Sequence, residues 1–307
     1  MPTFHRILVP VDFSDCSERA LQYGAAFARH EQAQLHLLHV VQEVLPVTPG
    51  GGMVLPQETY VQEIQNSARK ALNVLPKAEV AKDVKVTREL RTGSPADATL
   101  EYATSHAVDL ICLGTHGRSG LSRFLLGSVA ERVVQHAPCA VLVVRTQEHE
   151  FVNANSTEIQ LRKVLIPIDF SEFTAGALQD GLAIARHFGA EVHLLHVVED
   201  TSPAVSETAL AYPVFQEYVK TITEDARARM EKLPLESFEG LAVHKHIKVG
   251  APFELIVREA SALDADLVVM GTHGRVGLSH WFLGSVAERV VRKAHCPVMV
   301  TPRRPAN

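Results

Sequence analysis

Short apolar runs alternate with longer amphipathic stretches along the chain. Ile7–Val11 is a β-branched run typical of a buried strand, and Cys16–His30 follows with helical spacing of its apolar positions. The same alternation continues to residue 145 and predicts five strands and four helices. The other predicted strands are Leu35–Val41, Val84–Leu90, Asp109–Leu113 and Ala140–Arg145, and the other helices are Gln57–Leu75, Pro95–His106 and Ser128–His136.

Strand and helix in alternation predict a parallel sheet with helices on both faces and right-handed crossovers. We expect the strand order 3-2-1-4-5, in which strands 1 and 4 are neighbours and the chain leaves them in opposite directions. Ligands bind at such a switch point, outside the carboxyl ends of the strands. Asp12 follows strand 1 and a glycine-rich loop follows strand 4, so both are predicted to lie there.

The second half of the chain repeats the first. RILVPVDFS at residues 6–14 returns as KVLIPIDFS at 163–171, HLLHVV at 36 returns at 193, and GTHGRSGLSRFLLGSVAERVV at 114 returns as GTHGRVGLSHWFLGSVAERVV at 271. Every pair is offset by 157 residues, the difference between 163 and 6, which indicates a duplicated domain. The fold class is therefore α/β, with two tandem Rossmann-like domains at residues 1–146 and 161–307, joined by a polar linker at 147–160.

Length and charge narrow the functional class. A chain of 307 residues fits two domains of about 150 residues each. Its net charge of -5, without basic blocks, argues against nucleic acid as a partner. The four cysteines form no CxxC motif and are typical of a reducing compartment. No signal-peptide pattern or membrane-spanning apolar run is present, so we expect a cytoplasmic protein with no membrane partner.

A glycine-rich loop precedes a helix in each half. In the first half Gly114–Arg118 opens the loop, and Gly127–Ser128 closes it just before the helix. Glycines let the backbone approach a ligand closely, and free amides at a helix start attract phosphate. The pattern predicts a phosphate site, to which Arg118 adds one positive charge. The alternative is that the glycines only form a tight turn and Ser128 only caps the helix.

The aspartates after the first strand of each half also allow two interpretations. Asp12 and Asp169 can accept hydrogen bonds from a ribose, as acidic residues do in related mononucleotide folds. They can equally be turn or cap residues before the first helix.

These motifs resemble those of the universal stress protein family over nearly all of both halves. The sequences PVDFS and PIDFS are similar to the family's first-strand signature, and the loop G-2x-G-9x-G-S marks its ATP-binding branch. The resemblance implies ATP, with or without Mg²⁺, at two sites. By this resemblance Asp12 and Asp169 contact ribose, the backbone of Val40 and Val197 contacts adenine, and the glycine loops with Ser128 and Ser285 hold the phosphates.

The complete set of nucleotide-binding residues expected in the first half is Pro10, Val11, Asp12, Val40, Gly114, Thr115, His116, Gly117, Arg118, Gly127, Ser128 and Val129. In the second half it is Pro167, Ile168, Asp169, Val197, Gly271, Thr272, His273, Gly274, Arg275, Gly284, Ser285 and Val286. His116 and His273 lie inside the loops, where they can contact phosphate, act as a base or pack the loop.

We interpret the chain as a regulatory, non-enzymatic ATP-binding protein of the stress response. The P-loop pattern GxxxxGK[ST] is absent, the glycine loops contain no lysine, and no carboxylate pair is placed to position water or Mg²⁺. The alternatives are a slow ATPase or adenylating enzyme of the same broad fold, or a partner-binding module with vestigial pockets.

The histidines raise the question of a metal site. His193 and His196 are three apart on one strand, as His36 and His39 are, and therefore point to opposite faces. His244 and His246 share a face, but Thr87 and Glu89 replace them in the first half. We predict a solvated strand face there and no metal site.

The fifth strands suggest how the halves associate. Their sequences, CAVLVVR and CPVMVTP, are strongly apolar, and in the expected order each is an edge strand, which invites association when uncovered. Single-domain relatives in the resembled family pair two chains at this edge, so we expect the halves to form a dimer within one chain. Pro297 removes one ladder donor and limits that pairing. The sequence leaves further homo-oligomerisation open.

Overall fold

The computed structural model describes residues 4–42, 58–77, 80, 82–115, 126–145, 149–153, 158–199, 213–234, 238–272 and 284–302. The chain divides into two compact units. The first comprises Met1–Thr146 and Val152–Ile159, and the second comprises Gln147–Phe151 and Gln160–Asn307. The stretch expected as a linker is thus shared between the units.

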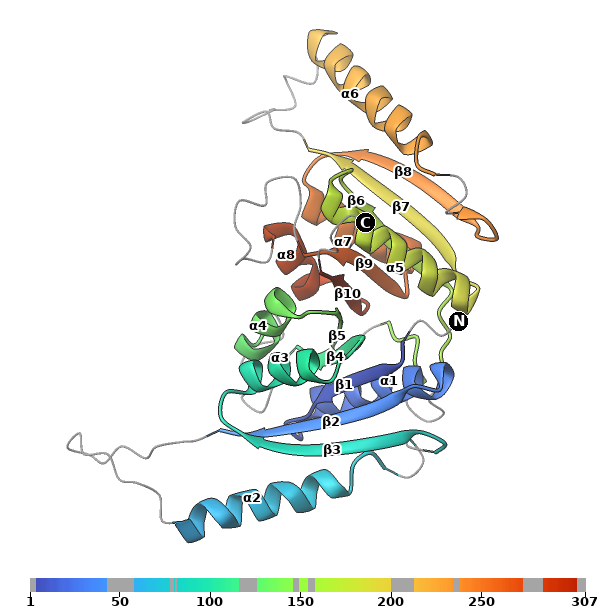
Figure 1. Cartoon of the computed structure of the whole chain (residues 1–307). Helices are drawn as coiled ribbons and strands as arrows, with labels where there is room; N and C mark the ends of the chain where they lie inside the picture. Colours follow the sequence, from blue (N-terminus) through green and yellow to red (C-terminus); the bar gives the residue numbers. More distant parts are fainter. Residues whose placement is uncertain are drawn as a thin grey trace, which may run out of the picture. The chain divides into compact units, whose positions relative to one another are not determined.

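The first unit is a parallel sheet with helices, as the alternation in the sequence predicts (Figure 1). Its strands pair in the order β3-β2-β1-β4-β5, so β1 lies between β2 and β4. The described elements are β1 (Arg6–Pro10), α1 (Asp15–Glu31), β2 (Gln34–Val41), α2 (Glu58–Asn73), β3 (Lys85–Thr92), α3 (Pro95–Ser105), β4 (Leu110–Gly114), α4 (Ser128–His136) and β5 (Ala140–Val144).

The second unit repeats this arrangement. Its strands pair in parallel in the order β8-β7-β6-β9-β10. The described elements are β6 (Lys163–Ile168), α5 (Glu172–Phe188), β7 (Glu191–Val198), α6 (Pro213–Glu231), β8 (Val243–Val249), α7 (Pro252–Leu263), β9 (Leu267–Gly271), α8 (Ser285–Lys293) and β10 (Val298–Thr301).

Helices cover both faces of each sheet (Figure 1). Leu35 of β2 faces α1, because a Cβ added to Gly24 would lie 3.5 Å from its side chain. The next residue, His36, bonds through Nδ1 to the hydroxyl of Tyr102 in α3 at 2.8 Å. Successive strand residues point to opposite faces, so α1 and α3 lie on opposite sides of the sheet.

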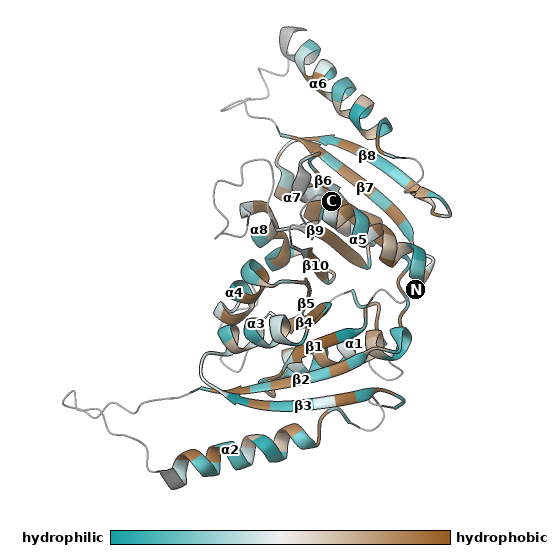
Figure 2. Ribbon diagram, in the orientation of Figure 1, coloured by the Kyte–Doolittle hydropathy of each residue, from teal (hydrophilic) through white to brown (hydrophobic). Residues whose placement is uncertain are grey.

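The central strands of each unit are apolar, whereas β3 and β8, each at one edge of its unit, mix polar and apolar residues. β4 reads LICLG and β9 reads LVVMG, as expected for strands covered on both faces. β3 reads KVTRELRT and β8 reads VHKHIKV, and both show teal segments between apolar ones in Figure 2. The core of each unit therefore lies around its inner strands.

Local chemistry sets the helix starts. The Ser14 hydroxyl accepts a hydrogen bond from the amide of Ser17 at 3.3 Å and caps α1. Pro95 occupies the first turn of α3, where its missing N–H costs nothing, and Ser94 is the N-cap. The predicted starts of both helices agree with the structure to within one residue. Among the described residues, no helix combines the length and apolar character that crossing a membrane requires.

Candidate functional site

The carboxyl ends of three strands meet at one level in the first unit. The register pairs Pro10 of β1 with Leu38 of β2, and two further residues place Asp12 level with Val40. The register of β1 with β4, extended in the same way, places Asp12 level with Thr115. The predicted switch point therefore brings together an acidic side chain, a strand backbone and the start of the glycine loop.

The second unit has the same geometry. Ile168 of β6 pairs with His196 of β7, so Asp169 lies level with Val197. The register of β6 with β9 places Asp169 level with Thr272. The switch-point arrangement is thus duplicated, as the repeat in the sequence requires.

The backbone of Val40 faces the switch point. The carbonyl of Val41 accepts a hydrogen bond from the amide of Gly93 at 2.9 Å, so Val41 faces β3. Backbone groups of successive residues in a parallel strand point to opposite sides, so the amide and carbonyl of Val40 point past the end of β1. Val197 has the same orientation, because Val198 accepts from Gly250 at 3.0 Å.

Each aspartate forms a turn. Oδ1 of Asp12 accepts hydrogen bonds from the amide and the hydroxyl of Ser14, at 3.0 and 2.5 Å. Oδ1 of Asp169 accepts the same two bonds from Ser171, at 2.9 and 2.6 Å, and a third from the hydroxyl of Thr174. The turn interpretation is therefore confirmed for one carboxylate oxygen in each unit.

A left-handed phenylalanine follows each aspartate. Phe13 has φ 64° and Phe170 has φ 59°, a conformation that costs free energy for residues other than glycine. The ring of Phe13 lies 4.4 Å from the ring of His39, whose Nδ1 lies 2.6 Å from the carbonyl oxygen of Val11. His39 thus fixes the end of β1, a role that the sequence analysis missed although HLLHVV occurs in both halves.

The helix after each glycine loop starts without a side-chain cap. Gly127 is the N-cap of α4 with φ -64°, its amide donates to the carbonyl of Thr115 at 2.8 Å, and no described side chain caps the helix. Ser128 is the first helical residue and its side chain is exposed, so the expectation that it caps the helix is wrong. Gly284 has φ -56° and the same bond to Thr272, also at 2.8 Å.

The remaining predicted residues divide into two groups. The first group lies at strand ends and helix starts. At the ends of β1 and β6 are Pro10, Val11, Pro167 and Ile168, and at the ends of β4 and β9 are Gly114 and Gly271. The first turns of α4 and α8 contain Val129, Ser285 and Val286. The loop interiors lie outside the described residues, and the predictions for His116, Gly117, Arg118, His273, Gly274 and Arg275 stay predictions.

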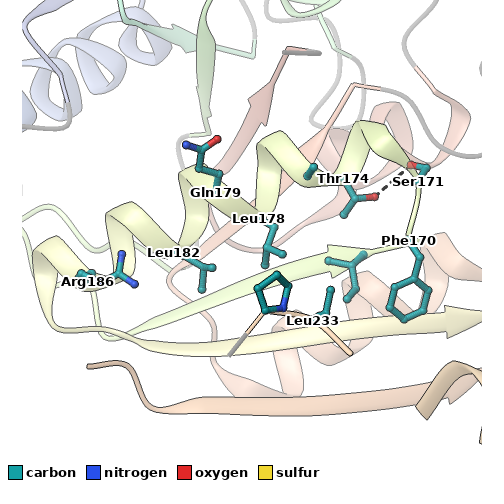
Figure 3. Close-up of a pocket in the computed structure, with 11 residues that line it drawn as sticks. Phe170, Ser171, Thr174, Leu178, Gln179, Leu182, Arg186 and Leu233 are labelled. Atoms are coloured by element: carbon teal, nitrogen blue, oxygen red, sulfur yellow. Dashed lines mark hydrogen bonds between the residues drawn. The ribbon is translucent and has the colours of Figure 1, made fainter. Parts of the chain in front are cut away.

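A cavity of about 690 Å³ lies on the α5 side of the second unit (Figure 3). Leu178 and Leu182 of α5 line it, with Leu233 across from them and Phe170 at one end. In the first unit Glu18 takes the position of Ala175 and forms an ion pair of 2.6 Å with Lys77. Sequence reasoning missed this cavity because it depends on how α5 packs against the segment after α6.

A polar cluster lies on the α7 face of β7 and β8. Nδ1 of His193 lies 3.1 Å from Nε2 of His246, and the rings of His193 and His244 stack at 4.8 Å. Burial, followed by the neighbouring His244 and His246, lowers the pKa of His193 to about 4. His193 is therefore neutral near pH 7. With an exposed fraction of 6% it is buried, whereas His244, on the strand face predicted to be solvated, is exposed and His246 is half-buried.

Three cysteine thiols offer no nucleophile, and of these Cys112 and Cys296 are buried and Cys139 is half-buried. Burial raises the pKa of Cys139 and of Cys296 to about 12, and burial raises the pKa of Cys112 as well. These thiols stay protonated at neutral pH, and the thiolate is the reactive form.

The comparisons with known proteins agree with this architecture. The model of the universal stress protein family matches residues 3–145 and 160–302. A universal stress protein of Mycolicibacterium smegmatis is 30% identical over 98% of both chains, and one of Methanocaldococcus jannaschii is 38% identical over 46% of this chain and 82% of its own. The crystal structure of a universal stress protein from Archaeoglobus fulgidus matches with a TM-score of 0.67 and 25% identity, covering 98% of this chain and 97% of that chain. The chain therefore belongs to the universal stress protein family, with one family domain in each half.

Proposed function

We propose that each unit binds one ATP, with or without Mg²⁺, at its switch point, and that the chain is a regulatory protein of the stress response rather than an enzyme. The supporting observation is the uncapped start of α4 beside the end of β4. The bond from Gly127 to Thr115 holds this helix start at the level of Asp12 and Val40. The arrangement recurs in the second unit, with Gly284 and Thr272.

The backbone conformation of Gly127 supports an anion-binding role for this helix start. With φ -64° and ψ 148°, the residue adopts a conformation open to any amino acid, so glycine is not required by the backbone. Serine, aspartate and asparagine are the better caps for such a helix start. A glycine here leaves the first amides of α4 open to an anion, which the helix dipole also favours.

Calorimetric titration of the full chain with ATP tests the proposal. We expect two ATP per chain. Gly127→Asp caps α4 with a carboxylate and repels phosphate, so it removes one site while stability stays equal or rises by a few tenths of a kcal/mol. Gly127→Asn is the matched neutral cap and should weaken binding less. Gly284→Asp is the corresponding change in the second unit. A stoichiometry near zero for the unmodified chain would support a partner-binding module with vestigial pockets.

Asp12→Asn separates the two roles of the aspartate. Asparagine also forms Asx turns, so the bonds from Ser14 are kept and stability changes little. Loss of a charged acceptor for the ribose should weaken ATP binding by about 1–3 kcal/mol. The affinity is measured in the Gly284→Asp background, where only the first site binds. An unchanged affinity for ATP would show that Asp12 only forms the turn and does not bind the ribose.

ATP turnover tests the non-enzymatic part of the proposal. Enzymes typically turn over at about 1–10³ s⁻¹. We expect ATP hydrolysis by the purified chain to be far slower than this range. A rate within it would identify the chain as an ATPase.

A further inference from the structure

The polar cluster on β7 and β8 contains three potential metal ligands. Glu191 and His193 are two apart on β7 and share a face, and His193 pairs with His244 of β8 in the register. Oε2 of Glu191 lies 3.8 Å from Nε2 of His193 and 3.8 Å from Nε2 of His244. One ligand atom from each of the three residues lies within 4.8 Å of the others.

The most buried of the three potential ligand atoms, Nε2 of His193, lacks a hydrogen-bond partner in the described part of the chain. A buried polar atom without a partner is costly, and native proteins rarely leave one. This atom lies 3.8 Å from Oε2 of Glu191, and a cation bound there would satisfy it. The rings of His193 and His244 stack at 4.8 Å with an interplanar angle of 20°, so the exposed ring of His244 rotates to share the cation.

The other ring nitrogen of His193, Nδ1, has a hydrogen-bond partner of the kind that metal-binding histidines usually have. Nδ1 lies 3.1 Å from Nε2 of His246, so His193 can donate its Nδ1–H and keep Nε2 free of a proton. Metal-binding histidines almost always donate their second ring N–H to such a partner. His246 is thus a positioning residue and not a ligand.

We propose that Glu191, His193 and His244 bind one divalent transition-metal ion, with Zn²⁺ as the best fit, on the outer strands of the second unit. Two histidines and a glutamate form a known zinc ligand set that leaves the fourth position to water. Ligand atoms on a tetrahedral Zn²⁺ are about 3.4 Å apart at bond lengths of about 2.0–2.2 Å, so small side-chain movements close the site. The side chains of Glu191 and His244 are both 51% exposed, which gives the ion access from solvent.

The first unit provides an internal control. Gln34 and Thr87 stand where the second unit has Glu191 and His244, and the Gln34 amide donates to the Thr87 hydroxyl at 2.8 Å. His36 keeps the position of His193, and its Nε2 is likewise buried without a hydrogen bond to the described residues, while its Nδ1 bonds to Tyr102. The unpaired nitrogen is therefore common to both units, and Glu191 and His244 are what the second unit adds. Among the described residues, the group of three ligands on this face occurs in the second unit alone, so the proposed metal site would distinguish the two halves.

A second cluster of potential metal ligands in the same unit, formed by His149, Asp264 and His295, is a poorer candidate for a metal site. His149 uses both ring nitrogens, at 3.1 Å from a carboxylate oxygen of Asp264 and at 2.5 Å from one of Asp266. Both of its potential ligand atoms therefore already contact a carboxylate oxygen. His295 lies beside it, with ring centroids 5.6 Å apart, and provides a control variant.

Calorimetric titration of the EDTA-treated, desalted full chain with zinc chloride alone tests the site. We expect His244→Thr and Glu191→Gln, which introduce the residues of the first unit, to weaken this binding by at least tenfold. His246→Gln should weaken it about 10–100-fold, as expected for the partner of a metal-binding histidine. His295→Gln and His36→Gln should bind zinc as the unmodified chain does. Circular dichroism checks that each variant is folded.

The possible outcomes are distinct. No zinc binding by the unmodified chain, or equal binding by His244→Thr and Glu191→Gln, would overturn the proposal. Loss of binding in His295→Gln alone would place the metal at the other cluster and also overturn it. The experiment contains no nucleotide, so its outcome is independent of the ATP proposal, and Gly127→Asp should leave zinc binding unchanged.

Discussion

The first glycine of the loop motif has a packing role. A Cβ on Gly114 would lie 2.8 Å from both the carbonyl carbon and the carbonyl oxygen of Cys16, at the start of α1. Because these are backbone atoms, no side-chain rotation relieves the contact. Gly114 therefore lets α1 approach the end of β4, and this approach places the turn of Asp12 at the switch point.

We expect Gly114→Ala to destabilise the protein by about 1–3 kcal/mol, the usual cost of overpacking. Urea unfolding followed by circular dichroism measures the change. Gly127→Asn is the control from the same motif, since the φ of -64° suits asparagine and asparagine is at least as good an N-cap as glycine, so little loss of stability should follow. Equal stabilities for the two variants would contradict the packing role of Gly114.

His36 should make stability depend on pH. Burial, followed by the charges of His106 and Arg6, lowers the pKa of His36 below its ordinary value of 6.5. The unfolded chain therefore binds a proton that the folded chain does not, and stability falls as the pH drops below 6.5. We expect His36→Gln to lose less stability than the unmodified chain between pH 7.5 and pH 5.5, in urea midpoints. An identical loss would show that other groups cause the acid sensitivity.

Helix α1 shows how one element is fitted to the sheet. A Cβ on Gly24 would lie 2.5 Å from a methyl group of Val9, and one on Gly181 of α5 would lie 2.5 Å from the end of Ile166. These glycines bring the helices close to the central strands. Among the described residues, a Cβ on Gly176, also in α5, would have only the carbonyl oxygen of Pro302 within 4 Å, at 3.5 Å.

The same substitution should therefore have opposite effects at two helix positions. Gly176→Ala gains helix propensity without a clash, and we expect a gain of up to about 1 kcal/mol in stability. Gly24→Ala gains the same propensity but forces Val9 to move, so a net loss is expected. Thermal unfolding of both variants measures the difference. A loss in both would mean that propensity does not limit stability in these helices.

The hydrophobic pattern predicted the elements well because each strand and helix carries its own period. It could not predict the register between strands. His193 was compared with His196 on its own strand, whereas its close neighbours His244 and His246 lie on β8. The cluster with Glu191 exists only after β7 and β8 are aligned. The turn formed by Asp12 was one of two interpretations, since spacing alone cannot show which bonds a carboxylate makes.

The segment that connects the units belongs to both. Val152 pairs with Ile159 in an antiparallel bridge, and the guanidinium of Arg19 donates to the carbonyl of Val152 at 2.7 Å. The preceding residues belong to the second unit, where the amide of Gln160 donates to the carbonyl of Phe151 at 2.7 Å. Composition predicted a simple polar linker at 147–160, and it missed these contacts because they depend on buried backbone groups.

Strand β5 leads to a prediction for the whole molecule. All five of its residues, Ala140–Val144, are buried in the full chain, although β5 is the last strand in the order of its own unit. If the halves pair through their fifth strands, a fragment of residues 1–146 lacks the partner strand, and we expect it to self-associate through β5 in sedimentation velocity at tens of micromolar. That fragment also loses residues 152–159, which belong to the first unit. A fragment of residues 1–160 keeps them and is the matched control.

If the exposed edge of β5 drives association, both fragments associate. Association of the shorter fragment alone would assign the effect to the lost segment, and stable monomers of both would contradict pairing of the halves through their fifth strands.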